Sequence, residues 1–474
     1  MPLLAALVPA LKRSEKVVLP LSVLSAAVVF SLVVIATIDV LTLGGVVAIP
    51  HWIELDGFGA LLELLISFVG MTAALYSWGD LGFGRGTPGQ VRGYAANFNL
   101  FVMSMLAIPL TVEPGLAWIA VGLTTLFSVL LVSYENTHDA LEAAWKYATL
   151  TLVGSAVAVL GFLVLFWAMR TAGGDDFTWR GLAAIASHLP PALVTVAFAF
   201  ILIGLGTKTG LVPLHTWLPD AHSQAPSPVC ALLSGVETST ALYVILRLVP
   251  VFRSANTLHV NAWLLIVGFI SLGTAAFLLL QAQDYKRLFA FSTVEHMGIV
   301  LVAVGMGTAL ASYGAAWQLA THALAKSLCF YASGAALAAF GTRMIANTGD
   351  LVGRSRIAAV ALFIGVLAIA GAPPFAVFLS EFAIARAAFT ASQSFVGLML
   401  IFFIGIAFFG LFGRAIRVIF GPPPAAVHSA DQAHSVNVPM VTAIVIAMVP
   451  VVLFGVWIPE PLARLFELSS RALQ

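Results

Sequence analysis

The amino-acid sequence predicts an all-α polytopic membrane protein, and three observations predict it. Of the 474 residues, 61% are hydrophobic and only 9% are Asp, Glu, Lys or Arg, whereas about a quarter of the residues in ordinary soluble domains are charged. Apolar runs long enough to cross a bilayer recur along the whole chain, and the polar stretches between them are short. We therefore expect one membrane domain over residues 1–474, with no separate soluble domain.

Each apolar run is expected to form a transmembrane helix, because a hydrocarbon core of about 30 Å takes about 20 helical residues and a helix satisfies its own backbone hydrogen bonds. The chain has about 13 such runs, within a range of about 12–14. In chain order they are 17–38, 58–76, 94–112, 115–133, 145–168, 191–210, 227–248, 262–281, 288–308, 313–340, 357–383, 394–419 and 437–457.

Basic loop residues predict the orientation, because cytoplasmic loops of membrane proteins are enriched in Lys and Arg. Placing the N-terminus in the cytoplasm puts these residues inside: Lys12, Arg13, Lys16, Arg85, Arg92, Lys146, Lys286, Arg287, Arg343, Arg354, Arg356, Arg414 and Arg417. The smaller outside group is Arg170, Arg180, Arg247, Arg253, Arg386, Arg464 and Arg471. The first charges follow a short apolar run, the reverse of a secretory signal. We expect a retained N-terminus and a multi-pass protein of the cell inner (cytoplasmic) membrane.

Composition and motifs exclude several classes of function. A net charge of +1 supplies no basic field for nucleic acid, so no nucleic-acid partner is expected. Cys230 and Cys329 make no CxxC motif, disulfide framework, iron–sulfur site or zinc site. The chain also has no GxGxxG after a strand, no Walker lysine, no HExxH and no CxxCH haem site. We expect no cofactor in this chain, so any redox chemistry belongs to a partner chain.

Ionisable residues inside the predicted helices carry the functional argument. A charge at the bilayer centre costs at least about 2.5–3.5 kcal/mol, and such residues pair with one another or line an ion path. The set comprises Lys208, Glu237, Glu295, His296, His322, Lys326 and Glu381. His322 and Lys326 are spaced i, i+4 and therefore share a helix face. Each residue alone could form a buried ion pair that holds two helices together, but a set spread over five helices favours a proton path.

Helix-breaking residues accompany two of these charges. Gly210 and Pro213 follow Lys208, and the segment Gly371–Phe375, with Pro373 and Pro374, precedes Glu381. A proline leaves carbonyls unpaired, which a membrane tolerates only where protein or water solvates them. Transporters build ion sites at such broken helices. The alternative is a plain proline kink; two breaks beside buried charges favour discontinuous helices.

The polar segment Leu211–Pro228 contains His215, Asp220 and His222. Its spacing does not supply a third geometric metal ligand, so we expect no metal there. Its prolines predict a rigid connection at the membrane surface. Asp220 is expected to cap the interfacial turn or to orient a histidine at a proton entrance.

Several segments resemble one known family in order and spacing. The run Lys208–Gly235 resembles the signature of the antiporter-like proton-translocating subunits of respiratory complex I and its relatives. The other matching segments are Ala140–Tyr147, Asp284–Gly298, Thr321–Leu328, Ala370–Phe375 and Ser380–Phe382. The Glu-His-Met-Gly and Ser-Glu-Phe variants are most similar to the F component of hydrogenase-4 and its formate hydrogenlyase counterpart. The likeness covers residues 55–420.

The resemblance implies two inverted five-helix repeats, 94–248 and 262–419, each with a broken helix, followed by a transmembrane helix at 437–457. By position, Lys208 corresponds to the broken-helix lysine of the first repeat, and Glu381 to the acidic residue of the second. His322 and Lys326 correspond to the central relay. The full proton relay we expect consists of Lys208, His215, Glu237, His296, His322, Lys326 and Glu381.

The chain departs from the family pattern at two positions. Gly122 stands where the family has a glutamate that pairs with the broken-helix lysine, and Ser239 stands where complex I members have a lysine. Lys208 therefore lacks its usual partner. Glu237 is either a replacement counter-ion for Lys208 or a surface residue near the start of its helix.

The expected function is a proton-translocating antiporter-like subunit of a complex I-like or hydrogenase-4-like respiratory complex. Such a chain belongs to a proton-translocating oxidoreductase without holding its redox centre. Its expected partners are other membrane subunits, a peripheral redox module, protons and lipid. Two alternatives stay open. The chain is a non-pumping membrane anchor disabled by the change at Gly122, or it is a cation/proton antiporter or the membrane subunit of an inorganic-carbon uptake complex.

Overall fold

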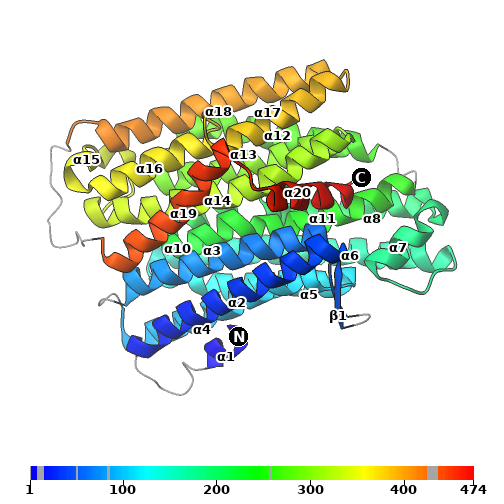
Figure 1. Cartoon of the computed structure of the whole chain (residues 1–474), viewed down its shortest axis with the longest axis horizontal. Helices are drawn as coiled ribbons and strands as arrows, with labels where there is room; N and C mark the ends of the chain where they lie inside the picture. The colour runs from blue at the N-terminus through cyan, green and yellow to red at the C-terminus, as the bar shows by residue number, and fades with distance from the viewer. Residues whose placement is uncertain (1, 8–14, 50–51, 83–85, 256–258, 424–435) are drawn as a thin grey trace.

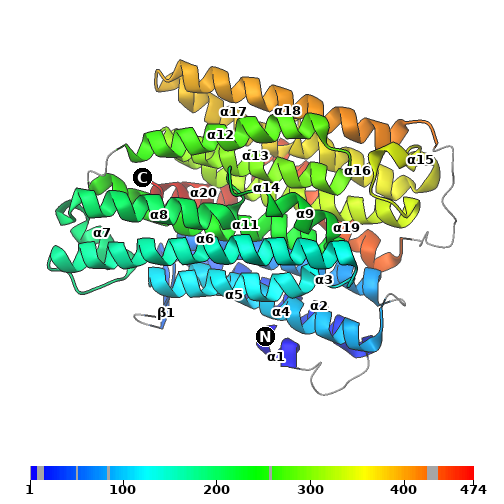
Figure 2. The same cartoon turned by 180° about the vertical axis from the view of Figure 1, so that it is seen from behind.

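The structure is a computed structural model, and it describes residues 2–7, 15–49, 52–82, 86–255, 259–423 and 436–474. In this part of the chain, 12 helices are long and apolar enough to cross a membrane. They run side by side in one bundle (Figure 1 and Figure 2). The chain is the all-α polytopic membrane protein that its composition predicts.

The membrane-crossing helices follow the predicted runs closely. They are α2 (Glu15–Leu43), α3 (Gly57–Leu81), α4 (Pro88–Leu110), α5 (Pro114–Val132), α6 (His138–Thr171), α8 (Pro191–Thr209), α12 (Val260–Gln281), α13 (Tyr285–Gly305), α14 (Ala309–Phe340), α18 (Ser394–Phe420) and α19 (Val438–Val456), with one composite helix made of α10 (Ser227–Leu232), the π-helical turn η3 (Leu233–Glu237) and α11 (Thr238–Ser254). The predicted run 357–383 is instead two short helices, α16 (Arg356–Ile369) and α17 (Ala376–Thr390).

Short elements fill the connections. They are α1 (Pro2–Leu7), α7 (Trp179–Ile185), η2 (Ala186–His188), α9 (Trp217–Gln224), η4 (Ile345–Asn347), α15 (Leu351–Arg354) and α20 (Glu460–Arg471). Strands β1 (Val46–Ile49) and β2 (Ile53–Leu55) form an antiparallel hairpin. Val46 faces Leu55 and Val47 faces Glu54, with an irregular register before Ile49. The helical periodicity of the chain gives no sign of this small hairpin.

The charged helices occupy the centre of the bundle. Buried residues make up 100% of the most apolar stretch of the composite helix α10–α11, 94% of that of α13 and 83% of that of α14. The corresponding share is 28% for α2, α18 and α19. The helices that carry Glu237, His296 and Lys326 therefore contact protein on nearly all sides, while α2, α18 and α19 form part of the outer layer. Lipid does not reach the ionisable side chains.

Both predicted helix breaks are present. Helix α8 ends at Gly210, which has a left-handed backbone (φ 84°), and the next helix begins only at Trp217. Helix α16 ends at Ile369, and Gly371 (φ 68°) and Pro373 separate it from α17. A cis peptide bond precedes Pro213 in the first break and Pro374 in the second. The prediction of two interrupted helices is confirmed.

The segment 211–228 is more than the predicted surface connection. It contains helix α9, which packs against α6 and α13 and brings Asp220 to one end of the bundle. Trp217, Leu218 and His222 are fully buried there. The physical reason is that Trp217 and Leu218 bury large apolar surfaces against neighbouring helices, which outweighs the polar composition of the segment.

The basic residues sort to the two ends of the bundle as predicted. Asp220 forms ion pairs with Lys146 (3.2 Å) and Arg287 (2.6 Å), both predicted to be cytoplasmic. Asp56, which caps the opposite end of α3, pairs with Arg247 at 2.8 Å. The loop charges of the two predicted sides thus lie at opposite ends.

Candidate functional site

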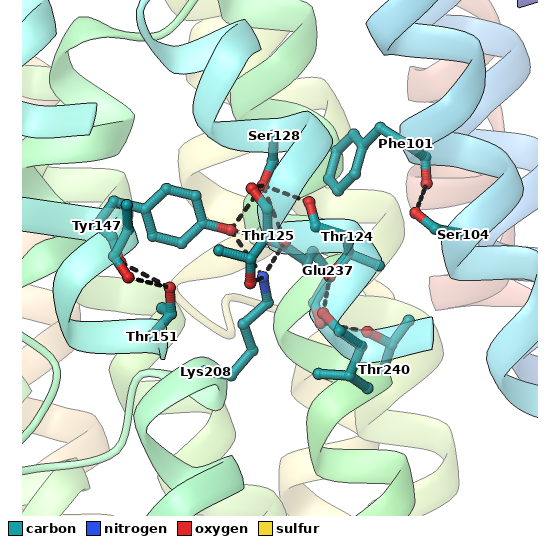
Figure 3. Close-up of polar contacts among 12 residues, drawn as sticks. Phe101, Ser104, Thr124, Thr125, Ser128, Tyr147, Thr151, Lys208, Glu237 and Thr240 are labelled. Atoms are coloured by element: carbon teal, nitrogen blue, oxygen red, sulfur yellow. Dashed lines mark hydrogen bonds and ion pairs between the residues drawn. The ribbon is translucent and has the colours of Figure 1, made fainter. Parts of the chain in front are cut away.

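Lys208 is buried in the last turn of α8, beside the first helix break. Its ammonium lies 2.6 Å from Oε1 of Glu237 and donates hydrogen bonds to Oγ1 of Thr125 (2.6 Å) and Oη of Tyr147 (2.8 Å), as Figure 3 shows. Of the two interpretations of Glu237, this contact supports the replacement counter-ion. Because Glu237 is fully buried, it is a counter-ion for Lys208 and not a surface residue.

Hydroxyl groups surround the carboxylate of Glu237. It accepts hydrogen bonds from the hydroxyls of Tyr147 (2.8 Å) and Ser128 (3.4 Å), and Ser128 also bonds Tyr147 (2.7 Å). Glu237 is the last residue of η3, and π-helical turns occur often at functional sites because they change which residues share a helix face. The Tyr147 hydroxyl contacts both members of the ion pair and can relay a proton between them.

The helix break is held by aromatic contacts. The Tyr147 ring stacks on Trp217 with centroids 4.4 Å apart, and the indole N–H of Trp217 donates to the carbonyl of Thr207 at 2.8 Å. That carbonyl lies in the last turn of α8 and also accepts the backbone N–H of Gly210 at 3.2 Å. Tyr147 therefore links the helix break to the ion pair, because its ring packs on Trp217 and its hydroxyl bonds to Lys208 and Glu237.

The two departures from the family pattern have clear surroundings. A Cβ placed on Gly122 would meet no atom within 4 Å, and Gly122 precedes Thr125 by three residues on the same face of α5. Helix α5 thus offers hydroxyls to Lys208, and the carboxylate comes from η3 instead. Ser239 is buried and donates to Gly235 at 3.4 Å, within its own helix.

His322 and Lys326 lie on one face of α14, as their spacing predicts. The ammonium of Lys326 donates to the carbonyl of Phe289 (2.5 Å) and to the hydroxyl of Ser292, both on α13. Nε2 of His322 lies 3.1 Å from the carbonyl of Ser234 on η3. The central lysine and histidine therefore connect α13 to the π-helical turn that ends in Glu237.

His296 joins the centre of the bundle to the second helix break. Its ring lies 5.0 Å from that of His322, centroid to centroid. Nε2 is 3.0 Å from the carbonyl of Ile369, the last residue of α16, and Nδ1 is 2.7 Å from Nε2 of Gln318. A carbonyl freed by the break is thus satisfied by protein, as the membrane requires.

Glu381 lies directly against the second break. Its carboxylate occupies the space that a Cβ on Gly371 would need. The neighbouring Ser380 donates to Oε1 of Gln318 at 2.5 Å, so Gln318 connects Glu381's turn to His296. Glu295 is also buried, lies within electrostatic reach of Lys326 and Glu381, and has an oxygen with no hydrogen-bond partner in the described residues.

His215 and Asp220 do not join this network. His215 is half-buried in the first break and makes no hydrogen bond to another residue of the predicted relay within the described chain. Asp220 neither caps a turn nor orients a histidine. Thr216 is the N-cap of α9, and Asp220 forms ion pairs with Lys146 and Arg287. That prediction was wrong because two cations reach the carboxylate from α6 and α13.

The described residues include no group of three or more His, Cys, Asp or Glu side chains that could hold a metal ion.

Several network residues were not singled out from the sequence. Glu63 of α3 is buried, and one of its oxygens has no hydrogen-bond partner in the described part of the chain. The rule that identified the other intramembrane charges could have found it. Thr125, Tyr147 and Gln318 carry no comparable signal, because hydroxyls and amides are common in helices and only their neighbours reveal their role.

Comparison with known proteins gives the family. The family described as "NADH:quinone oxidoreductase/Mrp antiporter, TM" matches residues 115–408. The chain is 35% identical over 428 residues to a hydrogenase-4 component F homolog of Methylacidiphilum infernorum (isolate V4), covering 88% of each protein.

Two solved structures share the fold. A chain of the membrane-bound sulfane sulfur reductase, an archaeal respiratory membrane complex, superposes with a TM-score of 0.87 at 24% identity, covering 100% of this chain and 96% of that one. A chain of the Mrp complex from Dietzia sp. DQ12-45-1b superposes with a TM-score of 0.84 at 19% identity, covering 100% and 95%. The part of the chain that the structure describes has twelve apolar helices long enough to cross a membrane, and the family match covers more than half of the chain. The chain is therefore a multi-pass integral membrane protein that belongs to the antiporter-like family of NADH:quinone oxidoreductase and Mrp membrane subunits.

Proposed function

We propose that this chain is a proton-translocating subunit of a complex I-like or hydrogenase-4-like respiratory complex in the cell inner (cytoplasmic) membrane. A peripheral redox partner supplies the energy, and this chain, with no cofactor of its own, moves protons. The observation that supports the proposal is the row of buried polar groups between the two helix breaks. It contains the Lys208–Glu237 pair, His322, His296 and Gln318, and it ends at Ser380, beside Glu381. Helices that serve only for packing rarely carry ionisable side chains at this depth, because burying each charge in the membrane costs free energy.

The row begins at the ion pair. In a low-dielectric interior, an ion pair and its neutral, proton-transferred form differ in energy by an amount that a nearby charge can reverse. The Tyr147 hydroxyl touches both groups, so a proton can move between lysine and glutamate without large side-chain motion. A charge change imposed by a partner chain near Lys208 would be felt at Glu237.

The row continues along η3 and α14. Ser234 of η3 accepts a contact from His322, and the His322 ring lies against the ring of His296. Gln318 then links His296 to the turn of Glu381. Nδ1 of His322 has no hydrogen-bond partner among the described residues, so a water molecule is needed to complete the path between the two rings.

We also propose that residues 94–248 and 262–419 are the two inverted repeats, followed by the transmembrane helix at 437–457. Each range contains one helix break with a left-handed glycine, Gly210 or Gly371. Each break lies beside one buried ionisable residue, Lys208 or Glu381. The anchor hypothesis rested on a lysine without a carboxylate; because Lys208 has one at 2.6 Å, that reason no longer applies.

Lys326→Ala and Glu381→Gln test the proposal in the complex purified with its natural partners and reconstituted into vesicles. A proton cannot cross apolar helix without an acceptor, so each variant should lower proton translocation per redox turnover by at least about tenfold. His322→Ala should do the same. Internal pH is followed with a dye while the partner enzyme is energised, and redox turnover in detergent should stay near the wild-type value.

Arg356→Gln, an exposed charge at the end of the bundle, is the matched control and should pump normally. Normal pumping by both Lys326→Ala and Glu381→Gln would refute the relay. A wild-type complex that makes no proton gradient would favour the anchor, and a gradient carried by Na⁺ would favour the cation antiporter.

A further inference from the structure

Helix α20 carries a stripe of charged side chains on its exposed face. Glu460, Arg464, Glu467 and Arg471 are spaced by four, three and four residues, so they share one face, and all four are exposed. None has an ion-pair or hydrogen-bond partner among the residues that the structure describes. The opposite face, with Leu465, is buried against the bundle. We call these four residues the α20 charge stripe.

The C-terminal end of α20 lies at the end of the bundle where α3 begins. The hydroxyl of Ser469 donates to the carbonyl of Gly57, the first residue of α3, at 3.1 Å. Arg253, near the end of α11, donates to the carbonyl of Leu473 at 2.8 Å. This end of the helix is therefore at the membrane surface.

The N-terminal end of α20 lies deep inside the bilayer. Ile458 and Leu462 line the same hollow as Leu65 and Phe68 of α3. These α3 residues are eight and eleven positions after Gly57, which places them about 12–16 Å inside the membrane at 1.5 Å per residue. Figure 1 shows α20 running along the bundle, beside its neighbours. Glu460 therefore lies near the middle of the bilayer.

Contact between lipid chains and the inner half of the stripe would cost free energy. A charge at the bilayer centre costs at least about 2.5–3.5 kcal/mol, and Glu460 and Arg464 both point away from the bundle. Amphipathic helices that tolerate such charges lie flat in the interface, whereas α20 runs into the membrane. By contrast, exposed residues of α2 such as Leu32 and Ile35 are apolar and suit lipid.

An apolar hollow of about 220 Å³ lies under the inner face of α20. Side chains of α2, α3, α14, α19 and α20 line it, including Phe30, Leu65, Trp317, Phe454 and Phe466. Leu462 and Phe466 of α20 face this hollow, on the side of the helix opposite to the charge stripe. The apolar face of α20 therefore packs on the bundle, and only the charged face is left for another molecule.

We propose that the α20 charge stripe binds a transmembrane helix of a neighbouring membrane subunit. That helix carries charged or amide side chains that alternate with the signs of the stripe. Membership of a family whose relatives are components of membrane complexes makes such a neighbour available. The inference rests on that membership and on the geometry of α20, and is independent of proton transport.

Photo-crosslinking in intact membranes tests which molecule covers the stripe. The photoreactive residue p-benzoylphenylalanine replaces Arg464, and in a control chain it replaces the lipid-facing Leu32. We expect Arg464 to give an adduct with an integral membrane subunit that co-purifies in fixed ratio with the chain, and Leu32 to give none. An adduct with a second copy of this chain, or no protein adduct at Arg464, would overturn the proposal.

A charge exchange separates recognition from folding. Glu460→Arg with Arg464→Glu keeps net charge, composition and the possible pairing within the helix, and inverts only the pattern that a neighbour meets. We expect wild-type amounts of the chain in the membrane and about tenfold less co-purified neighbour. Arg356→Gln is the control. If the chain itself is lost, Arg464→Gln alone is measured the same way. Retention of the neighbour by every inserted variant would refute the interface.

Discussion

At the residue scale, Glu237 stands where its carboxylate can do the work of a glutamate missing from α5. Lys208 receives hydroxyls from Thr125 and Tyr147 and its countercharge from η3. Removing one member of a buried ion pair leaves the other charge uncompensated, which costs about 3–5 kcal/mol. The distance between the carboxylate and the Lys208 ammonium matters more than which helix carries the carboxylate. A glutamate on α5 should therefore be able to replace Glu237.

Glu237→Gln should abolish most proton translocation and destabilise the chain by about 3–5 kcal/mol. Adding Gly122→Glu should restore part of both, because a side chain at Gly122 meets open space one turn from Thr125. Vesicle acidification and thermal unfolding measure the two effects. The matched control is Gly115→Glu in the Glu237→Gln background. It also meets open space but lies two turns away and should restore nothing. Equal rescue at both positions would mean that distance to Lys208 is irrelevant.

At the element scale, the two helix breaks position the two ends of the polar row. Each break combines a left-handed glycine with a proline that cannot continue a helix. At the second break, the carbonyl freed at Ile369 contacts His296, and Glu381 packs where a side chain on Gly371 would stand. The break therefore serves the site by bringing a backbone carbonyl and a carboxylate to the same place.

Gly371→Ala should destabilise the protein by about 1–3 kcal/mol, because alanine is strained at φ 68°. Its Cβ should also displace Glu381, so proton translocation should fall. Gly405→Ala in α18, where a Cβ meets no atom within 4 Å, is the control and should leave both unchanged. Thermal unfolding of the purified complex gives the stability difference. Full stability in Gly371→Ala would contradict the role assigned to this backbone conformation.

At the scale of the whole molecule, charged residues and buried polar residues occupy different regions of the bundle. Charged loop residues collect at the two ends, with Lys146 and Arg287 at one and Arg247 at the other. Between the ends, polar groups collect in the central helices and apolar groups on α2, α18 and α19. The proposed proton path lies in these central helices and leads from the first helix break to the second.

Cysteine labelling in oriented cells should place the Arg356 end in the cytoplasm. The native Cys230 and Cys329 are buried and should stay silent. Arg356→Cys should react with a maleimide only after the membrane is permeabilised, whereas Ser187→Cys, exposed at the other end, should react in intact cells. The reverse pattern would invert the orientation predicted from the basic loops.

The sequence by itself determined the class of fold, the positions of the helix breaks and most of the ionisable set. These features are local: twenty apolar residues, a Gly–Pro break or a lysine in an apolar run keeps its meaning wherever the helix packs. The broken run 357–383 and the shared face of His322 and Lys326 follow from spacing alone. The same rule applies to Glu63, an acidic residue in the apolar run of α3.

Only the tertiary structure decided which of these residues meet. The contact between Lys208 and Glu237 joins helices through a π-helical turn, and no periodicity in the sequence announces the change of face that such a turn makes. Gln318 and Tyr147 belong to the site because they contact His296 and Glu237. Asp220 does not belong to it, because its carboxylate forms ion pairs with Lys146 and Arg287 instead. The burial of α9 and the depth of α20 likewise depend on packing between segments far apart in the chain. Local composition fixes what a helix can carry, and the direction of its side chains toward other helices is settled only when the bundle packs.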